Sequence, residues 1–468
     1  MRQTALLLLL AAIMPVVVHS QTVDRTKPPQ TPPIPDFKLP SLYETSLPNG
    51  LKIVLVEDAR FPLVTLRLAF LGGSKFDPPS LPGLSESTAA LLTEGTKTRS
   101  SRQIAEELAE IGGTLNGASG PDGLTLAGSS LADHAPKLIE ILADVIRNAS
   151  FPADEVELRK QNRKEALRAQ RSQPSFLADE KLAATVFGSH PYSHIAPTME
   201  SLERMDQKAL ANFRDTYLVP NNATLVLLGR LPGRQQTLKL VRAAFEDWKQ
   251  KALPPAPKAE FPAGQRGILL VDRPGSVQAD IHVGQLAVTR SSPEFFPLMM
   301  ASTILGGGTN SRMFRNIREK EGFAYDAHSF LDTKRDAGVM TAITQVRNDV
   351  IEPAMQALLT EMEGMAKQAV PAGELSASKN FVSGVFLLRL ETQDGLATQL
   401  SNMKILGLPN SYLEHYTSSV RSVEPDQIQA VARKYIAPGD AAIVVVGDAS
   451  KISKPLEKFG KVTVTKAN

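Results

Sequence analysis

Hydrophobic and polar positions along this chain of 468 residues follow strand-like and helix-like patterns in two similar series. In the first series, three apolar stretches predict strands over 51–56, 64–70 and 223–229. The first of these strands follows Asn49-Gly50, a dipeptide typical of tight turns. Apolar residues at helical spacing predict helices over 83–94, 101–111 and 135–147, and a long charged segment predicts a further helix over 153–171.

The second series begins after residues 249–264, a Pro-rich stretch without apolar periodicity that is typical of a linker. Beyond this linker, apolar runs predict strands over 267–271, 278–288 and 441–447. Helical periodicity predicts helices over 293–305, 311–320, 350–368 and 372–389.

The two series end in matching residues. Tyr, Pro and Gly recur at the same spacings, as Tyr217, Pro220 and Gly229 and again as Tyr435, Pro438 and Gly447. Upstream, Asp206-Gln207 and Asp426-Gln427 are each expected to open a helix, in registers that differ by two residues. The repeat is too long for a solenoid unit. It predicts a duplicated domain, with an N-terminal copy at 41–248 and a C-terminal copy at 265–468.

The N-terminus predicts a signal peptide over residues 1–20. Arg2 precedes an apolar run from Ala5 to Val18, and Ser20 is a small residue that fits a cleavage site. Since the run is short for a membrane span, we expect export to the periplasm or the exterior without a stable membrane anchor. An uncleaved anchor is the alternative. The Pro-rich residues 21–40 predict an extended lead-in.

Composition excludes several kinds of chemistry. The 52 basic residues nearly balance the 49 acidic ones, so nothing indicates nucleic acid as a partner. Cysteine is absent, which rules out disulfides, thiolate nucleophiles and thiolate metal ligands. No nucleophile and base stand at an interpretable spacing, which disfavours a lone hydrolase that works without metal.

The histidines do not form a recognisable zinc motif. A catalytic zinc needs about three converging ligands, and the string His-x-x-Glu-His is missing. His190 and His194 are four residues apart, but Pro191 and Pro197 disfavour a helix there. We expect them to be loop residues with ordinary hydrogen bonds. The same expectation holds for the isolated His134, His282, His328 and His415.

Residues 83–96 nevertheless resemble the zinc helix of the pitrilysin and mitochondrial processing peptidase family, the inverzincins. The frame of that helix is present as Gly83, Leu91, Leu92, Gly95 and Thr96. Glu86 stands in place of the first His ligand, Ala89 in place of the general-base Glu, and Ala90 in place of the second His. The resemblance therefore implies a degenerate motif with no metal in this chain.

A further Glu ligand of that family would fall on the predicted helix 153–171. Glu157 and Glu165 are the nearest candidates, and their other interpretation is a solvated helix face. Restoring this ligand alone would not restore a zinc site, because the two His and the general base are still missing.

The second constellation lies in the C-terminal copy. Gly306, Gly307 and Gly308 form a loop that permits close approach of another chain. Beyond it, Arg318 and Tyr325 converge if the chain turns back at Gly322. A guanidinium and a phenol are donors suited to an oxyanion. Taken alone, an Arg at a helix end and a Tyr in a core are also ordinary structural residues.

This segment is similar to the Leu-Gly-Gly-Gly-x-x-Ser-Arg-Leu-Phe and Arg-Glu-x-x-Gly-Leu-Ala-Tyr strings of the same family. There, an Arg and a Tyr seven residues apart bind substrate and stabilise the tetrahedral intermediate. The resemblance implies catalytic roles for Arg318 and Tyr325, and substrate binding by Gly306, Gly307 and Gly308.

The resemblance also implies a fold and a function. The fold would be α+β, with two homologous α/β halves, each a mainly antiparallel sheet with helices packed on it, forming a clam-shell around a peptide chamber. The chain would be the non-zinc subunit of a heteromeric zinc metallopeptidase. It would be inactive alone and would contribute Arg318 and Tyr325 to the site of a homologous, zinc-bearing partner. The alternative is a catalytically inert peptide-binding or scaffold subunit.

Overall fold

The computed structural model describes residues 37–258, 260–264 and 266–467. The predicted signal peptide and all of the predicted lead-in before Phe37 lie outside these residues. Within the described ranges, no helix combines the length and the apolar character that crossing a membrane requires. Residues 249–264, the predicted linker, contain no helix or strand at their described positions.

The first half is built on a six-stranded sheet with the strand order β1-β2-β6-β3-β5-β4. Its strands are β1 (Leu42–Ser46), β2 (Lys52–Glu57), β3 (Leu63–Leu71), β4 (Thr114–Ser119), β5 (Gly123–Leu131) and β6 (Ala223–Gly229). Only β2 and β6 pair in parallel. The central strand β6 is buried along its whole length, which explains why its sequence is a continuous apolar run.

The second half repeats this arrangement with the strand order β12-β7-β11-β8-β10-β9. Its strands are β7 (Gly267–Asp272), β8 (Gln278–Ala287), β9 (Ala324–Thr333), β10 (Gly338–Arg347), β11 (Ala442–Gly447) and β12 (Val462–Lys466). The parallel pair β7–β11 corresponds to β2–β6, and the antiparallel strands β8, β10 and β9 correspond to β3, β5 and β4. The edge strands differ, because β12 pairs with β7 in parallel whereas β1 is antiparallel to β2.

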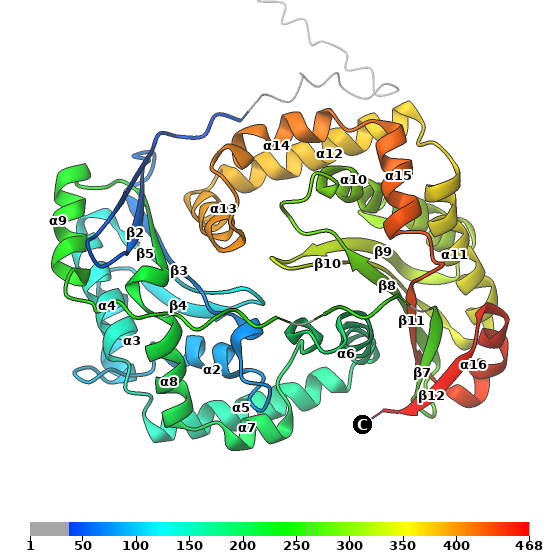
Figure 1. Ribbon diagram of the computed structural model, residues 1–468, viewed down its shortest axis with the longest axis horizontal. Coiled ribbons are helices and arrows are strands. Elements are labelled where there is room, and N and C mark those ends of the chain that lie inside the picture. Colours follow the sequence, from blue (N-terminus) through cyan, green and yellow to red (C-terminus); the bar gives the residue numbers. More distant parts are fainter. Residues whose placement is uncertain (1–36, 259, 265, 468) are drawn as a thin grey trace, which may run out of the picture. The chain divides into compact units, whose positions relative to one another are not determined.

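Helices cover both sheets (Figure 1). The first half contributes α2 (Leu84–Leu91), α3 (Ser101–Glu110), α4 (Ala135–Asn148), α5 (Ala153–Arg171), α6 (Pro174–Phe187), α7 (Met199–Arg204), α8 (Gln207–Tyr217) and α9 (Arg234–Phe245). The second half contributes α10 (Phe295–Gly306), α11 (Ile351–Lys367), α12 (Ala372–Leu390), α13 (Gln393–Leu406), α14 (Ser411–Arg421), α15 (Pro425–Tyr435) and α16 (Ala449–Leu456). The prediction of two homologous α/β halves with mainly antiparallel sheets is confirmed.

The residues that matched between the two series occupy equivalent places. Tyr217 ends α8 and Tyr435 ends α15, while Gly229 and Gly447 end the paired central strands β6 and β11. Asp206 caps α8 through a hydrogen bond from the Ala209 N–H. Asp426 instead lies inside α15, which Glu424 caps, so the two-residue difference in register is a difference in where the helix begins.

The segment predicted as a helix over 311–320 contains a π-helix, Phe314–Lys320. A π-helix is wider than an α-helix, and π-helical turns frequently occur at functional sites. Over so few residues, hydrophobic spacing does not distinguish the two helix types, and the sequence alone therefore predicted only an ordinary helix.

One helix from each half packs on the sheet of the other half. The apolar side chains Leu177, Leu182 and Val186 of α6 join a cluster with Val444 and Val446 of β11. In return, α13 packs against β3 and β6, and its Leu396, Ala397 and Leu400 share a cluster with Val226 and Leu228. Figure 1 shows α6 beside β8 and β11. The two halves therefore do not have separate cores.

An ion pair between a buried lysine and a partly exposed aspartate joins the halves at the turn between β9 and β10. Lys75 of the first half is only 4% exposed, and its Nζ lies 2.5 Å from Oδ2 of Asp336 in that turn. His190 Nε2 lies 3.3 Å from the same carboxylate oxygen. Burial lowers the pKa of His190, although Asp336 opposes this shift. The carboxylate of Asp336 therefore neutralises the buried ammonium beside an imidazole that burial favours as neutral.

A second buried contact extends this junction. The Tyr192 hydroxyl donates to Asp122 Oδ1, and Asp122 Oδ2 accepts the backbone N–H of Arg335 at 2.8 Å. Burial raises the pKa of Tyr192 well above its ordinary range, and Asp122 adds to that shift. The turn of the second half is thus held by polar groups of the first half that have no access to water.

We predict that Asp336→Ala lowers the free energy of unfolding by about 1–3 kcal/mol, because the buried Lys75 ammonium loses its counter-charge at a site that water reaches on the Asp336 side. Denaturant unfolding measures this value. The control is Asp349→Ala, which removes the partner of the exposed Arg347 and is expected to change stability by less than about 1 kcal/mol. Equal effects of the two substitutions would contradict a special role for the buried pair.

Candidate functional site

The helix that resembles a zinc helix, α2, begins at a half-buried carboxyl, that of Asp77. Asp77 accepts the backbone N–H groups of Gly83 and Ser85, each at 2.8 Å, and so satisfies donors at the start of the helix. Burial raises the pKa of Asp77 to about 7, even though these hydrogen bonds act in the opposite direction. The sequence analysis did not single out Asp77, since its partner residues become apparent only when the loop folds back.

Glu86, which stands at the first ligand position, is bound by two arginines of α5. Its Oε1 lies 2.9 Å from Arg159 Nη2 and 2.9 Å from Arg163 Nε. The Arg163 side chain is largely buried, whereas Glu86 and Arg159 are partly exposed. The carboxylate therefore already has two cationic partners and links α2 to α5.

The other positions of the motif do not supply metal ligands. Ala89 is fully buried and Ala90 is half-buried, and neither has a side chain that can bind a metal or accept a proton. Glu157 contacts Lys160 and Gln161 of its own helix, and Glu165 contacts Arg168. Across the part of the chain that the structure describes, no three side chains of His, Asp or Glu form a group suited to a metal ion. The residues at positions 86, 89, 90, 157 and 165 therefore do not fit a zinc site.

The retained frame of the motif has a structural role. Gly95 has a φ of +137°, and a Cβ there would lie 2.9 Å from Pro152. The Thr96 hydroxyl donates to Asp144 at 2.8 Å and accepts the backbone N–H of Arg99 at 3.0 Å.

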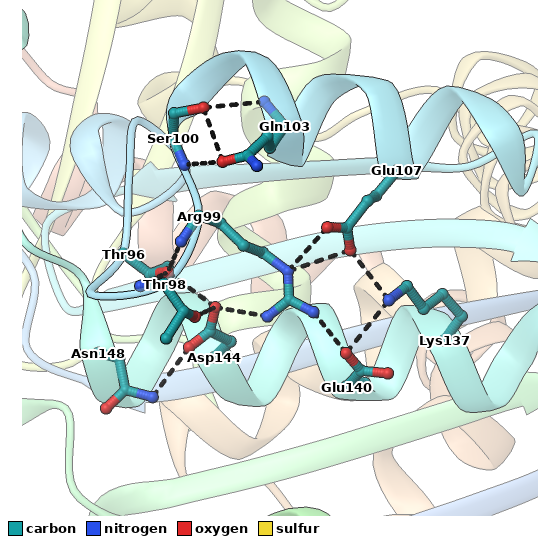
Figure 2. A network of polar contacts seen from close by, with 10 residues as sticks. All are labelled: Thr96, Thr98, Arg99, Ser100, Gln103, Glu107, Lys137, Glu140, Asp144 and Asn148. Atoms are coloured by element: carbon teal, nitrogen blue, oxygen red, sulfur yellow. Dashed lines mark hydrogen bonds and ion pairs between the residues drawn. The ribbon is translucent and has the colours of Figure 1, made fainter.

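Figure 2 shows the network around this loop, in which the Arg99 guanidinium contacts Glu107, Glu140 and Asp144. In the same network, Ser100 and Gln103 form the capping box of α3. The frame of the motif thus shapes the loop after α2 independently of any metal.

Arg318 and Tyr325 lie together, as their spacing predicted. The guanidinium carbon of Arg318 is 4.8 Å from the ring centroid of Tyr325 and 4.5 Å from that of Phe314. Tyr325 is 81% exposed at the start of β9, so it does not serve as a core residue. Gly322, with a φ of +65°, turns the chain between the two residues. The contact with Phe314, which also positions the guanidinium, was not predicted.

The three glycines differ in what surrounds them. A Cβ at Gly306 would lie 2.1 Å from the backbone nitrogen of Ser329, so this glycine lets α10 approach β9 closely. Gly307 caps the end of α10, where its backbone N–H donates a hydrogen bond to the carbonyl oxygen of Thr303 at 2.8 Å. Gly308 faces open space and lines, with Gly307, a cavity of about 400 Å³. Of the three, only Gly307 and Gly308 are therefore placed to contact a ligand.

A cavity of about 410 Å³ lies next to Glu86 and has walls from both halves. Tyr192 and His194 line it from the first half, and Phe330 and Lys334 line it from the second. His190 is buried and accepts the N–H of Tyr192, in agreement with its expected loop role. No local sequence pattern indicates which residues line this cavity, because its walls combine segments of the two halves that lie far apart along the chain.

Comparison with known families matches both halves of the chain. Residues 52–197 match the family described as "Insulinase (Peptidase family M16)", and residues 204–382 match "Peptidase M16 inactive domain". An uncharacterized zinc protease of Mycobacterium leprae is 25% identical over 419 residues, covering 88% of this chain and 93% of the relative. Another, of Bacillus subtilis, is 22% identical over 388 residues, covering 82% of this chain and 93% of the relative.

Two solved structures share the fold. The crystal structure of a peptidase M16 inactive domain from Pseudomonas fluorescens has a TM-score of 0.79 at 25% identity, covering 87% of this chain and 98% of that one. A protease from Helicobacter pylori has a TM-score of 0.81 at 19% identity, covering 87% of this chain and 100% of that one. Relatives named zinc proteases thus share most of this chain, whereas its positions 86, 89 and 90 do not fit zinc.

We predict that Glu86→Gln lowers the free energy of unfolding by about 1 kcal/mol, because Arg159 and Arg163 lose the carboxylate between them. EDTA is expected to leave the melting temperature of both proteins unchanged. The control is Glu106→Gln, at an exposed pair with Arg102, which should change stability by less than about 0.5 kcal/mol. A fall in the wild-type melting temperature with EDTA would show that a metal does contribute.

We predict that stability depends on pH through Asp77. Its folded pKa of about 7 lies above its ordinary value of 3.8, so folding favours the protonated carboxyl. The resulting stabilisation is complete below about pH 4 and is lost as the pH rises through about 7. Between pH 5 and 7, wild-type stability should fall relative to Asp77→Asn with a slope approaching about 1.4 kcal/mol per pH unit, and the difference should level off above about pH 8. Asp133→Asn, at an exposed carboxylate, should follow the wild type. A constant difference between wild type and Asp77→Asn would refute the raised pKa.

Proposed function

Because the chain belongs to peptidase family M16, we propose that it is a zinc-less subunit that completes the peptide-cleaving site of a homologous, zinc-bearing chain. In this assembly, Arg318 and Tyr325 would bind the substrate and stabilise the oxyanion. Zinc and its chemistry would belong to the partner chain. The proposal combines two features of this chain, a motif that does not fit zinc and an exposed Arg–Tyr pair.

The observation that carries the proposal is the contact between Arg318 and Tyr325. A guanidinium has five N–H donors and a phenol has one O–H donor, so the pair can donate to a single carbonyl oxygen as it gains negative charge. Stacking against Phe314 and Tyr325 restrains the Arg318 side chain. This restraint reduces the side-chain entropy that would otherwise be lost when substrate binds.

The high exposure of Tyr325 supports the same proposal. A tyrosine that is 81% exposed contributes little to the core, and its hydroxyl is accessible to a molecule outside the chain. A scaffold subunit has no need of such a residue beside an arginine. The same exposure leaves the pair open to a second protein, which a composite site requires.

We further propose that the assembly is a heterodimer that acts after export, with peptides enclosed between the halves of the two chains. The apolar stretch that ends at Val18 supports export, and the cavity beside Glu86 supports a peptide path between the halves. The glycine loop at 307–308 is proposed as part of that path, since it lines an open cavity.

We predict that the mature protein, tagged and recovered from the cell envelope, co-purifies with a homologous chain that carries His-x-x-Glu-His. In the purified complex, Arg318→Ala or Tyr325→Phe should each lower peptide turnover by roughly 10² or more, the typical effect of losing an oxyanion donor. Lys320→Ala, at an exposed position of the same helix, should leave turnover unchanged.

Unchanged turnover in both variants would remove the catalytic role and favour the alternative of an inert peptide-binding or scaffold subunit. Tyr325→Phe is the more decisive variant, because the exposed hydroxyl has no hydrogen-bond partner among the described residues and its loss disturbs no packing. Recovery of this chain by itself, without a zinc-bearing homologue, would overturn the composite site.

A further inference from the structure

A larger cavity, of about 690 Å³, lies between the two halves on the other side of the loop at residues 119–121. Its first-half wall comes from β3, β5 and the β4–β5 turn. Its second-half wall comes from α13, the end of α12, the start of α14, the end of β9 with the turn after it, and the loop between β8 and α10. It contains neither Arg318 nor Tyr325, and it does not include the positions of the degenerate zinc motif. No role in the proposed function has yet been given to it.

Positive charge predominates in this cavity. Four basic side chains line it, Arg67, Arg290, Lys334 and Arg389, against the two carboxylates of Asp122 and Asp332. Both of these carboxylates have partners. Asp122 accepts hydrogen bonds from Tyr192 and Arg335, and Asp332 pairs with Lys334.

Two of the four basic side chains have no carboxylate as an ion-pair partner among the described residues. Arg67 pairs with Asp394, and Lys334 pairs with Asp332. Neither Arg290 nor Arg389 has an Asp or Glu within ion-pair distance anywhere in the described ranges. The cavity therefore presents two guanidinium groups whose charge the protein itself does not neutralise.

Aromatic rings position the Arg290 guanidinium. Its carbon lies 4.2 Å from the ring centroid of Phe295 and 5.5 Å from that of Tyr412. Tyr412 lines the same cavity, and so does the exposed side chain of Arg389 at the end of α12. The stacking restrains Arg290, whereas Arg389 is free to move toward a ligand.

We propose that this cavity binds carboxylate side chains of an acidic segment of a peptide, with Arg290 and Arg389 as their partners. Guanidinium groups form strong, often bidentate hydrogen bonds with carboxylates. The neutral side chains of Thr398, Gln399 and Asn402 line the same cavity and offer donors and acceptors to a peptide backbone. The inference rests on the proposed function, since it names the class of peptide that the subunit would present to the cleavage site.

The test uses this chain alone and measures binding rather than cleavage. Two peptides of about ten residues, acetylated and amidated at their ends, differ only in a central Glu-Glu or Gln-Gln. Isothermal titration calorimetry should show the Glu-Glu peptide binding at least about tenfold more tightly, because each carboxylate gains a charge-assisted contact. Added salt should weaken its binding more than that of the Gln-Gln peptide.

The variants then assign the preference to residues. Arg389→Gln removes an exposed side chain and is expected to reduce the preference for Glu-Glu at least about threefold without altering the melting temperature. Arg290→Lys retains a positive charge over Phe295 and should retain part of the preference, whereas Arg290→Gln should lose it. Arg230→Gln, an exposed arginine outside the cavity, should behave as the wild type.

The outcomes separate this inference from the proposed function. Equal binding of the two peptides, or an unchanged preference in Arg389→Gln and Arg290→Gln, would overturn the acidic-ligand site and leave the composite cleavage site standing. Binding of neither peptide would overturn the peptide-binding role itself. Arg318→Ala should keep the full preference for Glu-Glu, because Arg318 does not line this cavity.

Discussion

The structure depends on the exchange of one helix between the two halves. The first half supplies α6 to the sheet of the second, and the second supplies α13 to the sheet of the first. Each sheet has two apolar faces, and its own helices do not cover both of them. Each exchanged helix buries the remaining apolar face of the sheet on which it packs. Leaving that face in water would cost roughly 25 cal/mol for each square ångström of apolar surface. The cavities between the halves are bordered by these same helices, so α6 and α13 also define the walls of the candidate sites.

The helix α2 illustrates how the outline of a motif can be present without its chemistry. Gly95 and Thr96 shape the loop that joins α2 to α3, and this role does not depend on a metal. Ala89 and Ala90 have no polar side chain, so they take no part in shaping the loop. Glu86 pairs with two arginines, Arg159 and Arg163, and these ion pairs join α2 to α5.

The sequence predicted those parts of the fold whose signals are local. The strands β2, β6 and β11 were predicted because each is a continuous apolar run, and α5 was predicted because it is a long charged segment without a turn signal. The strands β4 and β5 were missed because they are rich in Gly, Ser, Thr and Ala, whose small side chains give weak alternation. Helix α6 was missed for a different reason: its apolar side chains face a sheet whose strands lie far along the chain. Among the site residues, the contact between Arg318 and Tyr325 could be predicted, because it follows from a local turn at Gly322. The partners of Glu86 and the lack of a carboxylate partner for Arg290 could not be predicted, because they depend on tertiary packing.

The helix exchange has a consequence for how the protein reaches its final form. The apolar side of α6, including Leu177, Leu182 and Val186, is covered by β11, which begins at Ala442, far along the chain from the end of α6 at Phe187. Until that strand has been synthesised, this side of α6 is exposed and prone to aggregation. The burial of α6 is therefore delayed until the second half of the chain is available. For a protein with a predicted export signal, this delay is an advantage, because a chain that has not yet folded can still be threaded through a translocation channel.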